Sequence, residues 1–464
     1  MRTPKIGRAA PRPLQVGFVS LGCPKNLVDS EVMLGLLRER GHEIVGDARQ
    51  ADVIVVNTCA FIDRAKQESV DTILEMAAEK QEGRARRLVV TGCLVQRYDQ
   101  DLRGEIPEID ATLGTGQPME IVRAVEGEAT VLDDPDALPR WVYDHTSPRV
   151  LSTPPYLAYV KISEGCDYSC SFCIIPRLRG RHRSRPESDI VAEARQLAAQ
   201  GVKEIVLVAQ DTTRYGLDHG RRDALARLLR RLARVDGIRW IRVMYAYPST
   251  LSDPILDAIA SEEKVVKYLD LPLQHASESL LARMKRPVGH RHLRGLLARI
   301  RRRVPGVTLR TSFIVGFPGE TEDDFGQLLE FVEEAQFDHV GVFTYSDEEG
   351  TASFDLEDRI PPAVKERRRK RLMALQRRIC LKRNRALVGQ RVEVLIEGVH
   401  PESEHLLQGR TAGQAPEIDG AFIINAGRTE RAQSGSFAMC EVTAAHAYDL
   451  VGRVTAAVPS AKSA

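Results

Sequence analysis

Three cysteines of this chain lie within eight residues, with the spacing C-x3-C-x2-C. They are Cys166, Cys170 and Cys173. Three thiolates on one short loop can hold three corners of a 4Fe–4S cluster, which normally takes four cysteines. The missing fourth ligand leaves one iron open to a small molecule. The spacing therefore predicts a cluster that activates a cofactor, and not one that only relays electrons.

A structural zinc site is the first alternative for this loop. Structural zinc takes four ligands, usually from paired C-x2-C or His spacings. No second pair lies nearby in the sequence, and His182 alone is a poor fourth ligand. A disulfide is the second alternative, but three closely spaced cysteines are odd in number. The cluster remains the favoured interpretation.

Three further cysteines lie far apart in the sequence, yet each follows a predicted strand. Cys23, Cys59 and Cys93 come after the apolar runs Val16–Leu21, Val53–Val56 and Leu88–Val90. Neighbouring parallel strands lie about 4.8 Å apart, so the three sulfurs are expected to gather at one edge of a sheet. The pattern predicts a second site for a cubane cluster.

Two glycines support this second site, and one alternative remains. Gly22 and Gly92 stand directly before Cys23 and Cys93, where a missing side chain allows close approach of the backbone. The alternative is that these cysteines pack as small hydrophobic residues. We give that structural interpretation to two others without neighbouring partners, Cys380 and Cys440.

The elements around the second trio predict a doubly wound α/β domain over residues 14–125. Helical patterns at Asn26–Arg40 and Ile62–Glu79 alternate with the three apolar strands. Continuous apolar strands between helices are typical of a parallel sheet that is covered on both faces. Residues 126–151 are punctuated by Gly, Pro and acidic residues and are predicted to form a linker.

The alternation resumes over residues 152–383, which predict a partial (βα)6 barrel. Helical patterns, for example Glu187–Gln200, Ala224–Val235 and Thr321–Ala335, separate the strands. Ligands of such sheets bind at the carboxyl ends of the strands, and the loop of Cys166 follows the first strand. The expected strands are Tyr156–Ser163, Glu204–Ala209, Trp240–Ala246, Tyr268–Leu273, Thr308–Val315 and His339–Tyr345.

The last part of the chain changes character. Val364–Leu387 predicts a basic amphipathic helix, which is either a surface for RNA or the ribosome or a solvated face with ion pairs. Residues 384–454 then predict a small antiparallel β-barrel, because short strands alternate with Gly-rich turns. Its expected strands are Val392–Gly398, Ala421–Ile424 and Ser436–Ala444.

The composition narrows the setting but not the partner. The 66 basic and 64 acidic residues nearly cancel, so net charge indicates no class of ligand. Cysteines that act as thiolates need a reducing compartment, which favours the cytoplasm. Residues 1–10 lack an apolar signal core, and no apolar run is long enough for a membrane span.

These motifs together resemble the methylthiotransferases of the radical S-adenosylmethionine superfamily, from about Leu14 to Val454. The C-x3-C-x2-C loop, with Phe172 before its last cysteine, resembles the superfamily signature, and the terminal barrel resembles a TRAM domain. Four segments are most similar to the branch whose substrate is an aspartate of small-ribosomal-subunit protein twelve. They are Ser20–Glu31, Gly165–Pro176, Leu271–Ser277 and Ala415–Gly420.

The resemblance implies a mechanism. Two 4Fe–4S clusters would be bound, by Cys166, Cys170 and Cys173 and by Cys23, Cys59 and Cys93. S-adenosylmethionine would be the radical source and the methyl donor, and the second cluster would deliver sulfur to the β-carbon of the aspartate. A reductant protein would supply the electron, and the TRAM-like barrel is a candidate for contact with the ribosome or RNA.

The resemblance also suggests residues that contact S-adenosylmethionine. They are Phe172, Gln210, Arg310 and Gly316. Gln210 ends a strand, and Arg310 is expected to pair with the cofactor's carboxylate. Gly316 would admit the adenosine or would serve turn geometry alone. Two other functions stay open, a tRNA methylthiotransferase and a non-catalytic iron–sulfur or RNA-binding protein.

Overall fold

The computed structural model describes residues 12–128, 137–286, 290–427 and 433–457. The chain divides into two compact units. The N-terminal unit contains the chain up to Ser152 together with Ile174–Arg181, and the C-terminal unit contains Thr153–Cys173 and the chain from His182 onward. In the described part of the chain, no helix has the length and apolar character that a bilayer crossing requires.

The N-terminal unit is built on a parallel sheet with the strand order β2-β1-β3-β4-β5. The three predicted strands are confirmed as β1 (Gln15–Ser20), β3 (Val53–Thr58) and β4 (Arg87–Gly92). The sequence analysis missed the two edge strands, β2 (Glu43–Val45) and β5 (Ala111–Leu113), because each has only three residues.

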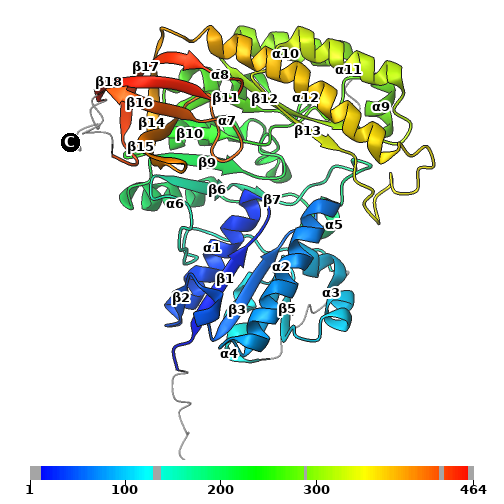
Figure 1. Ribbon diagram of the computed structural model, residues 1–464, viewed down its shortest axis with the longest axis vertical. Coiled ribbons are helices and arrows are strands. Elements are labelled where there is room, and N and C mark those ends of the chain that lie inside the picture. Colours follow the sequence, from blue (N-terminus) through cyan, green and yellow to red (C-terminus); the bar gives the residue numbers. More distant parts are fainter. Residues whose placement is uncertain (1–11, 129–136, 287–289, 428–432, 458–464) are drawn as a thin grey trace, which may run out of the picture. The chain divides into compact units, whose positions relative to one another are not determined.

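Apolar side chains of β3 point alternately to two cores, so helices cover both faces of this sheet (Figure 1). Ile54 and Val56 pack in one core, and Val53 and Val55 pack in the other. The doubly wound fold is thus confirmed. The helices are α1 (Pro24–Glu39), α2 (Asp63–Glu82), α3 (Cys93–Glu105), α4 (Ile121–Glu126) and α5 (Ile175–Arg179).

The stretch predicted as a linker, residues 126–151, begins at the last residue of α4, Glu126. The rest of its described part, residues 127–128 and 137–151, contains no helix or strand, and residues 129–136 lie outside the described chain.

The C-terminal unit begins with an open sheet of six parallel strands in the order β13-β12-β11-β10-β9-β6. This confirms the predicted partial barrel. Its strands are β6 (Leu157–Lys161), β9 (Glu204–Val208), β10 (Trp240–Val243), β11 (Val265–Asp270), β12 (Thr308–Val315) and β13 (His339–Thr344). A short hairpin pairs β7 (Ser163–Glu164) with β8 (Arg183–Ser184).

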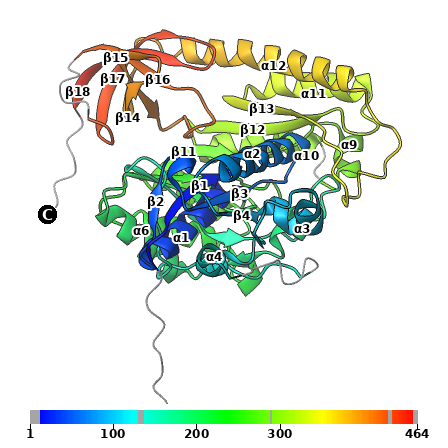
Figure 2. The same ribbon diagram turned by 60° about the horizontal axis from the view of Figure 1, so that its bottom comes forward.

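Helices alternate with the strands of this sheet, as the sequence pattern predicts. They are α6 (Glu187–Ala199), α7 (Ala224–Leu232), α8 (Asp253–Ser261), α9 (Glu278–Arg283), α10 (His290–Arg303) and α11 (Glu322–Ala335). The basic helix α12 (Pro362–Arg385) packs on α11 and β13 and leads into the terminal barrel (Figures 1 and 2).

The terminal module is a closed five-stranded barrel with the order β14-β15-β16-β18-β17. Four neighbouring pairs are antiparallel, but β16 and β18 run parallel, which the sequence analysis did not predict. Two strands were also missed, β15 and β18. The bounds are β14 (Arg391–His400), β15 (Ser403–Thr411), β16 (Phe422–Gly427), β17 (Phe437–Ala445) and β18 (Leu450–Ala457).

Buried ion pairs join this barrel to the open sheet. Arg410 of β15 donates to Glu204 of β9 at 2.8 Å, and both side chains are buried. The loop after β15 contributes Asp419, which accepts a hydrogen bond from the hydroxyl of Tyr268 on β11 at 2.7 Å. Asp419 belongs to the segment Ala415–Gly420, so one of the four segments behind the resemblance holds the barrel against the sheet.

Candidate active site

The three N-terminal cysteines follow the carboxyl ends of three adjacent strands. Ser20 of β1 pairs with Asn57 of β3, and Thr58 of β3 pairs with Gly92 of β4. Cys23, Cys59 and Cys93 come just beyond these residues, at the edge where strand order reverses between β1 and β3. Ligands of open α/β sheets bind at such a point. The predicted gathering at one sheet edge is therefore observed.

Glycine is required beside Cys59. Gly22 has a φ of +90°, and a Cβ at this position would lie 2.7 Å from the Cβ of Cys59 and 3.0 Å from its Sγ. Gly92 has a φ of +99°, and its Cβ would lie 2.6 Å from the carbonyl oxygen of Thr58. Both glycines permit the close approach that the sequence predicted.

Buried polar side chains fix the loops that carry the cysteines. The hydroxyl of Ser69, on α2, accepts a hydrogen bond from the backbone N–H of Cys59 at 3.0 Å and donates to its carbonyl at 2.8 Å. The amide of Asn26 donates to the carbonyl oxygens of Leu21 at 2.7 Å and Thr58 at 3.3 Å. Neither residue was singled out in the sequence, because a lone Ser or Asn carries no spacing signal.

The three thiols differ in electrostatic environment. Burial disfavours the thiolate of Cys23, but Lys25, Arg179 and backbone N–H groups at the start of α1 outweigh it, so its pKa lies below the ordinary value. Burial and then repulsion from the other two cysteines raise the pKa of Cys59 to about 12. Burial also raises the pKa of Cys93. The mutual repulsion reflects three sulfurs in one small region.

Arg179 lies at this trio and is buried, with 3% of its surface exposed. One guanidinium nitrogen donates to Asp29 at 2.5 Å, and the other donates to Asn26 Oδ1 at 2.9 Å and to Cys93 Sγ at 3.4 Å. Arg179 is one of five closely spaced arginines from Arg177 to Arg185, and this pattern left two roles open, steering of a carboxylate substrate or a solvated loop. The packing of α5 instead buries Arg179 against Cys93.

Cys166, Cys170 and Cys173, the loop trio, lie on the loop after β6 and β7, at the carboxyl end of the open sheet. The loop is anchored on both sides of Cys170. Ser171 donates from its N–H to Met284 O at 3.1 Å and from its hydroxyl to Arg283 O at 2.8 Å. Phe172 packs against a buried cluster that includes Phe317 and Met284. The signature aromatic therefore helps to anchor the loop.

A stack of four side chains holds the other end of this loop. Tyr168 lies parallel to Tyr247, with ring centroids 4.0 Å apart. Arg286 lies 4.3 Å from the Tyr247 ring centroid, and Arg214 lies 5.4 Å from that of Tyr168. Arg286 also directs a nitrogen to Cys170 Sγ at 3.8 Å. Stacked rings and guanidinium groups attract one another and resist motion of the loop.

The buried carboxylate of Asp211 completes this arrangement. It accepts hydrogen bonds from the hydroxyls of Tyr168 at 2.9 Å and Thr213 at 2.6 Å. Burial raises the pKa of Asp211 despite these donors. Asp211 therefore positions the cysteine loop through Tyr168, a contact that its place at a strand end did not reveal.

Gln210 lies among buried polar side chains beside the loop. Its amide donates to Glu164 at 2.5 Å, and Glu164 also pairs with the buried Lys161 at 2.5 Å. The side-chain oxygens of Gln210 and Ser163 are buried and accept no hydrogen bond from any described residue. Such orphaned acceptors suit a polar ligand with N–H or O–H groups. These two acceptor oxygens therefore fit the position predicted for the cofactor.

Two predicted cofactor contacts have other partners. Arg310 donates to Asp270 at 2.7 Å and lies 3.6 Å from Asp419, so two carboxylates already compensate its charge. This argues against its predicted pairing with a cofactor carboxylate. Gly316 has a φ of +75°, and a Cβ there would lie 2.3 Å from Cγ of Lys365 on α12. The structure thus favours the alternative of turn geometry for Gly316.

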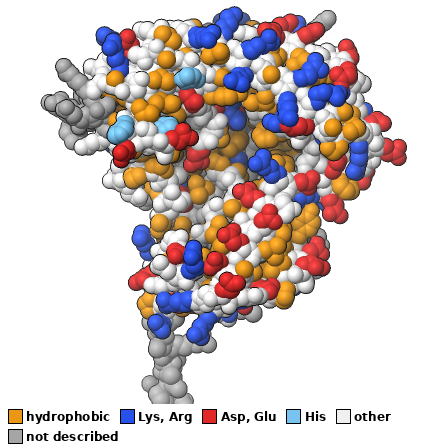
Figure 3. Space-filling model, viewed as in Figure 1, with side chains coloured by type: hydrophobic (Ala, Val, Ile, Leu, Met, Phe, Trp, Pro, Cys, Tyr) orange, Lys and Arg blue, Asp and Glu red, His pale blue; other side chains and the backbone are white. Residues whose placement is uncertain are grey.

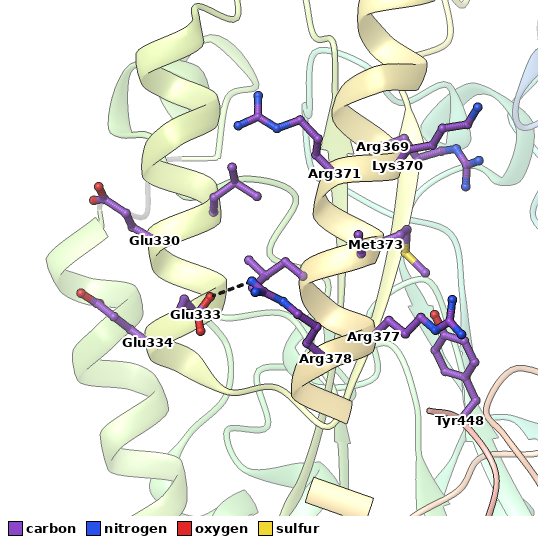
Figure 4. A pocket seen from close by; sticks show the side chains of 13 residues that line it. Glu330, Glu333, Glu334, Arg369, Lys370, Arg371, Met373, Arg377, Arg378 and Tyr448 are labelled. Atoms are coloured by element: carbon purple, nitrogen blue, oxygen red, sulfur yellow. Dashed lines mark ion pairs between the residues drawn. The ribbon is translucent and has the colours of Figure 1, made fainter. Parts of the chain in front are cut away.

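A groove of about 1180 Å³ lies between α11 and α12 (Figure 4). Glu330, Glu333 and Glu334 of α11 belong to its lining, and Glu333 points toward the basic side chains of α12. Arg378 and Glu333 are 3.7 Å apart and pair across the groove. Lys and Arg side chains gather over the helices of this region, with acidic residues among them (Figure 3). No cysteine lines the groove, so it is separate from the candidate centres.

Both trios suit clusters by their donor chemistry. Each presents three thiols, which are the usual ligands of 4Fe–4S clusters. Within the described residues, no three His, Cys, Asp or Glu side chains are arranged to hold a single metal ion. In a cubane cluster each thiolate binds a different iron, so such convergence on one point is not required.

Comparison with protein families divides the chain in three. Residues 15–114 match uncharacterized protein family UPF0004, residues 160–332 match the radical SAM superfamily, and residues 388–455 match the TRAM domain. Among solved structures, the radical S-adenosylmethionine methyltransferase TsrM from Kitasatospora setae is similar in fold. It shares 17% identity and a TM-score of 0.54, over 72% of this chain and 75% of that one.

Full-length relatives are much more similar. The ribosomal protein uS12 methylthiotransferase RimO of Anaeromyxobacter sp. (strain K) is 55% identical over 95% of this chain and 93% of its own. RimO of Myxococcus xanthus is 54% identical over 95% and 92%, and RimO of Koribacter versatilis is 49% identical over 96% and 97%. Sequence identity at this level, over all three regions, assigns the chain to one family. The chain belongs to the RimO family of ribosomal protein uS12 methylthiotransferases.

Proposed function

We propose that this protein is a radical S-adenosylmethionine enzyme that methylthiolates the β-carbon of an aspartate in ribosomal protein uS12. The observation that carries the proposal is the pair of cysteine trios, each at the carboxyl ends of parallel strands, in a chain about half identical to RimO over its whole length. We infer that the enzyme works in the cytoplasm, because its proposed substrate is a ribosomal protein.

The two trios take separate roles in this proposal. Cys166, Cys170 and Cys173 hold a 4Fe–4S cluster with an open iron for S-adenosylmethionine, and Cys23, Cys59 and Cys93 hold a second cluster. When bound, these groups supply the one-electron and sulfur chemistry that replaces a C–H bond by C–S–CH3. An electron-donating protein serves as reductant.

The protein's own residues hold the cysteine loop in place and bind S-adenosylmethionine. The stack of Tyr168, Tyr247 and Arg286 keeps the cysteine loop in place, and Arg286 faces Cys170 as a cation beside a thiolate. Gln210 and Ser163 offer buried acceptor oxygens to the amino or hydroxyl groups of S-adenosylmethionine. Phe172 supports the loop from the opposite side.

We further propose that the basic face of α12, the helix that leads into the terminal barrel, contacts ribosomal RNA. Its exposed basic residues recur at helical spacing along one side, and they attract a polyanion. Four are partly compensated. Arg367 and Arg371 lie about 4 Å from Glu322. Lys370 lies 3.8 Å from Glu366, and Arg378 pairs with Glu333. The residues are Arg367, Lys370, Arg371, Arg377, Arg378, Lys382 and Arg385.

An anaerobic assay tests the proposed function. The reconstituted full-length chain receives reductant, S-adenosylmethionine and either uS12 or tRNA. We expect 5′-deoxyadenosine with both, and a methylthio mass gain only on the aspartate of uS12. Cys166→Ala should abolish 5′-deoxyadenosine, whereas Cys59→Ala should keep part of it and lose the methylthio product. A gain on tRNA alone would overturn the proposal.

RNA binding is tested separately. Lys370→Glu with Arg377→Glu should weaken binding of an RNA oligonucleotide by roughly tenfold or more and flatten its salt dependence. Modification of isolated uS12 should be unchanged. Equal RNA affinity in the variant would refute the α12 contact and leave the enzymatic proposal intact.

A further inference from the structure

Arg179 connects to all three loops of the N-terminal trio. It donates directly to Cys93 Sγ and to the Oδ1 atom of Asn26. The amide nitrogen of the same Asn26 donates to the carbonyl oxygens of Leu21 and Thr58, which precede the other two cysteines. A single guanidinium therefore links the three positions from which the thiolates project.

The position of Arg179 is itself fixed. Leu178 beside it is buried in the core of the N-terminal unit, and the hydroxyl of Thr115 donates to the Leu178 carbonyl at 2.6 Å. Asp29 on α1 pairs with one guanidinium nitrogen at 2.5 Å, while Asn26 accepts from the other. An arginine whose planar fork is filled on several sides keeps its direction, which a lysine cannot reproduce.

The charge of Arg179 matters because the site is buried. Three cysteine thiolates outweigh the +2 core of a 4Fe–4S cluster, so the assembly is anionic. Burial of an anion is costly unless a cation and hydrogen bonds compensate it. Hydrogen bonds and net charge around the sulfurs also set the potential of such a cluster.

We propose that Arg179 is the positioning residue of the N-terminal trio: it orients Cys93 and the two neighbouring loops, and its charge retains the cluster and raises its reduction potential. The inference rests on the proposed function, since it assumes that this trio binds a cluster. Arg179 acts through the ligands and contacts no substrate.

The test uses the full-length chain with Cys166, Cys170 and Cys173 replaced by Ala, so that any cluster belongs to the N-terminal trio. In this background Arg179→Gln is compared with Arg179→Lys and with Arg177→Gln, an exposed arginine on the same helix. Iron content, the rate of iron loss to a chelator and the midpoint potential are measured.

We expect Arg179→Gln to lose iron at least about tenfold faster, as is typical when the partner of a metal ligand is removed. Its midpoint potential should fall. Arg179→Lys should recover most of the potential and only part of the retention, because it restores charge without the fork. Arg177→Gln should match the background in all three measurements.

Removal of Arg179 alone takes a charged partner from the buried Asp29, which can unfold the unit. The double variant Asp29→Asn/Arg179→Gln removes both charges, and circular dichroism reports its folding. A folded double variant that still loses iron rapidly supports the proposal. Unchanged retention and potential in Arg179→Gln would overturn it. A background chain that binds no iron would instead refute the cluster at this trio, and the inference with it.

Discussion

Gly22→Ala should empty the N-terminal trio and leave the loop trio loaded. Gly22 has a φ of +90°, and the new Cβ would lie 2.7 Å from the Cβ of Cys59. Nonbonded carbon atoms prefer about 3.5–4.0 Å, so Cys59 must move by roughly 1 Å. Bonds to a metal tolerate only about 0.2 Å. The displaced thiolate is therefore expected to lose its iron.

Backbone strain adds to this displacement, and a second glycine separates the two effects. A non-glycine residue in the left-handed region costs on the order of 1–3 kcal/mol. Gly41 has a φ of +96° with nothing within 4 Å of its Cβ position. Gly41→Ala therefore carries the strain without the clash, and it serves as the matched control.

The assay is iron analysis after anaerobic reconstitution, with product analysis on uS12. The wild-type chain and Gly41→Ala should hold about eight irons, and Gly22→Ala about four. Gly22→Ala should still form 5′-deoxyadenosine but lose the methylthio product, because the cluster that supplies sulfur is absent. Full iron content with normal product in Gly22→Ala would show that close packing against Cys59 is not needed.

Three further predictions concern stability and the loop trio. Arg410→Ala removes one partner of the buried Glu204 and should cost about 3–5 kcal/mol, measured as a lower denaturant midpoint with unchanged slope. Tyr168→Phe removes a hydrogen bond to Asp211 and should speed chelator removal of the loop cluster only; equal loss from both clusters would contradict its local role. Burial disfavours the charged form of Asp324, but hydrogen bonds from hydroxyl groups and the backbone outweigh it and lower the pKa from 3.8 to about 2. The folded state therefore gains roughly 2 kcal/mol of stability above pH 4, which should be lost as the pH falls through 2. Asp324→Asn should remove that part of the acid dependence of the free energy of unfolding.

The local pattern of apolar and polar residues in the sequence determined the architecture of this protein. Continuous apolar runs between helical segments specify buried parallel strands, and both sheets follow from that rule. Short edge strands such as Glu43–Val45 carry too few residues for a period to appear. The parallel pairing of β16 with β18 also lies outside any local pattern, because it depends on how the barrel closes.

Residue type and spacing likewise determined the chemistry. Cys166, Cys170 and Cys173 reveal themselves by close spacing. The N-terminal trio could be recognised because parallel strands place equivalent ends together, and the register of β1, β3 and β4 agrees. Both inferences depend on chain geometry that is the same in every protein.

The long-range partners of charged side chains were decided only by the tertiary structure. Arg310 was expected to meet a cofactor and instead pairs with Asp270 and lies near Asp419. Arg179 was expected either to steer a carboxylate substrate or to lie in a solvated loop, and it is instead buried against Cys93. A long side chain reaches partners 40 to 150 residues away in sequence, and which partner it meets depends on packing that local pattern does not encode.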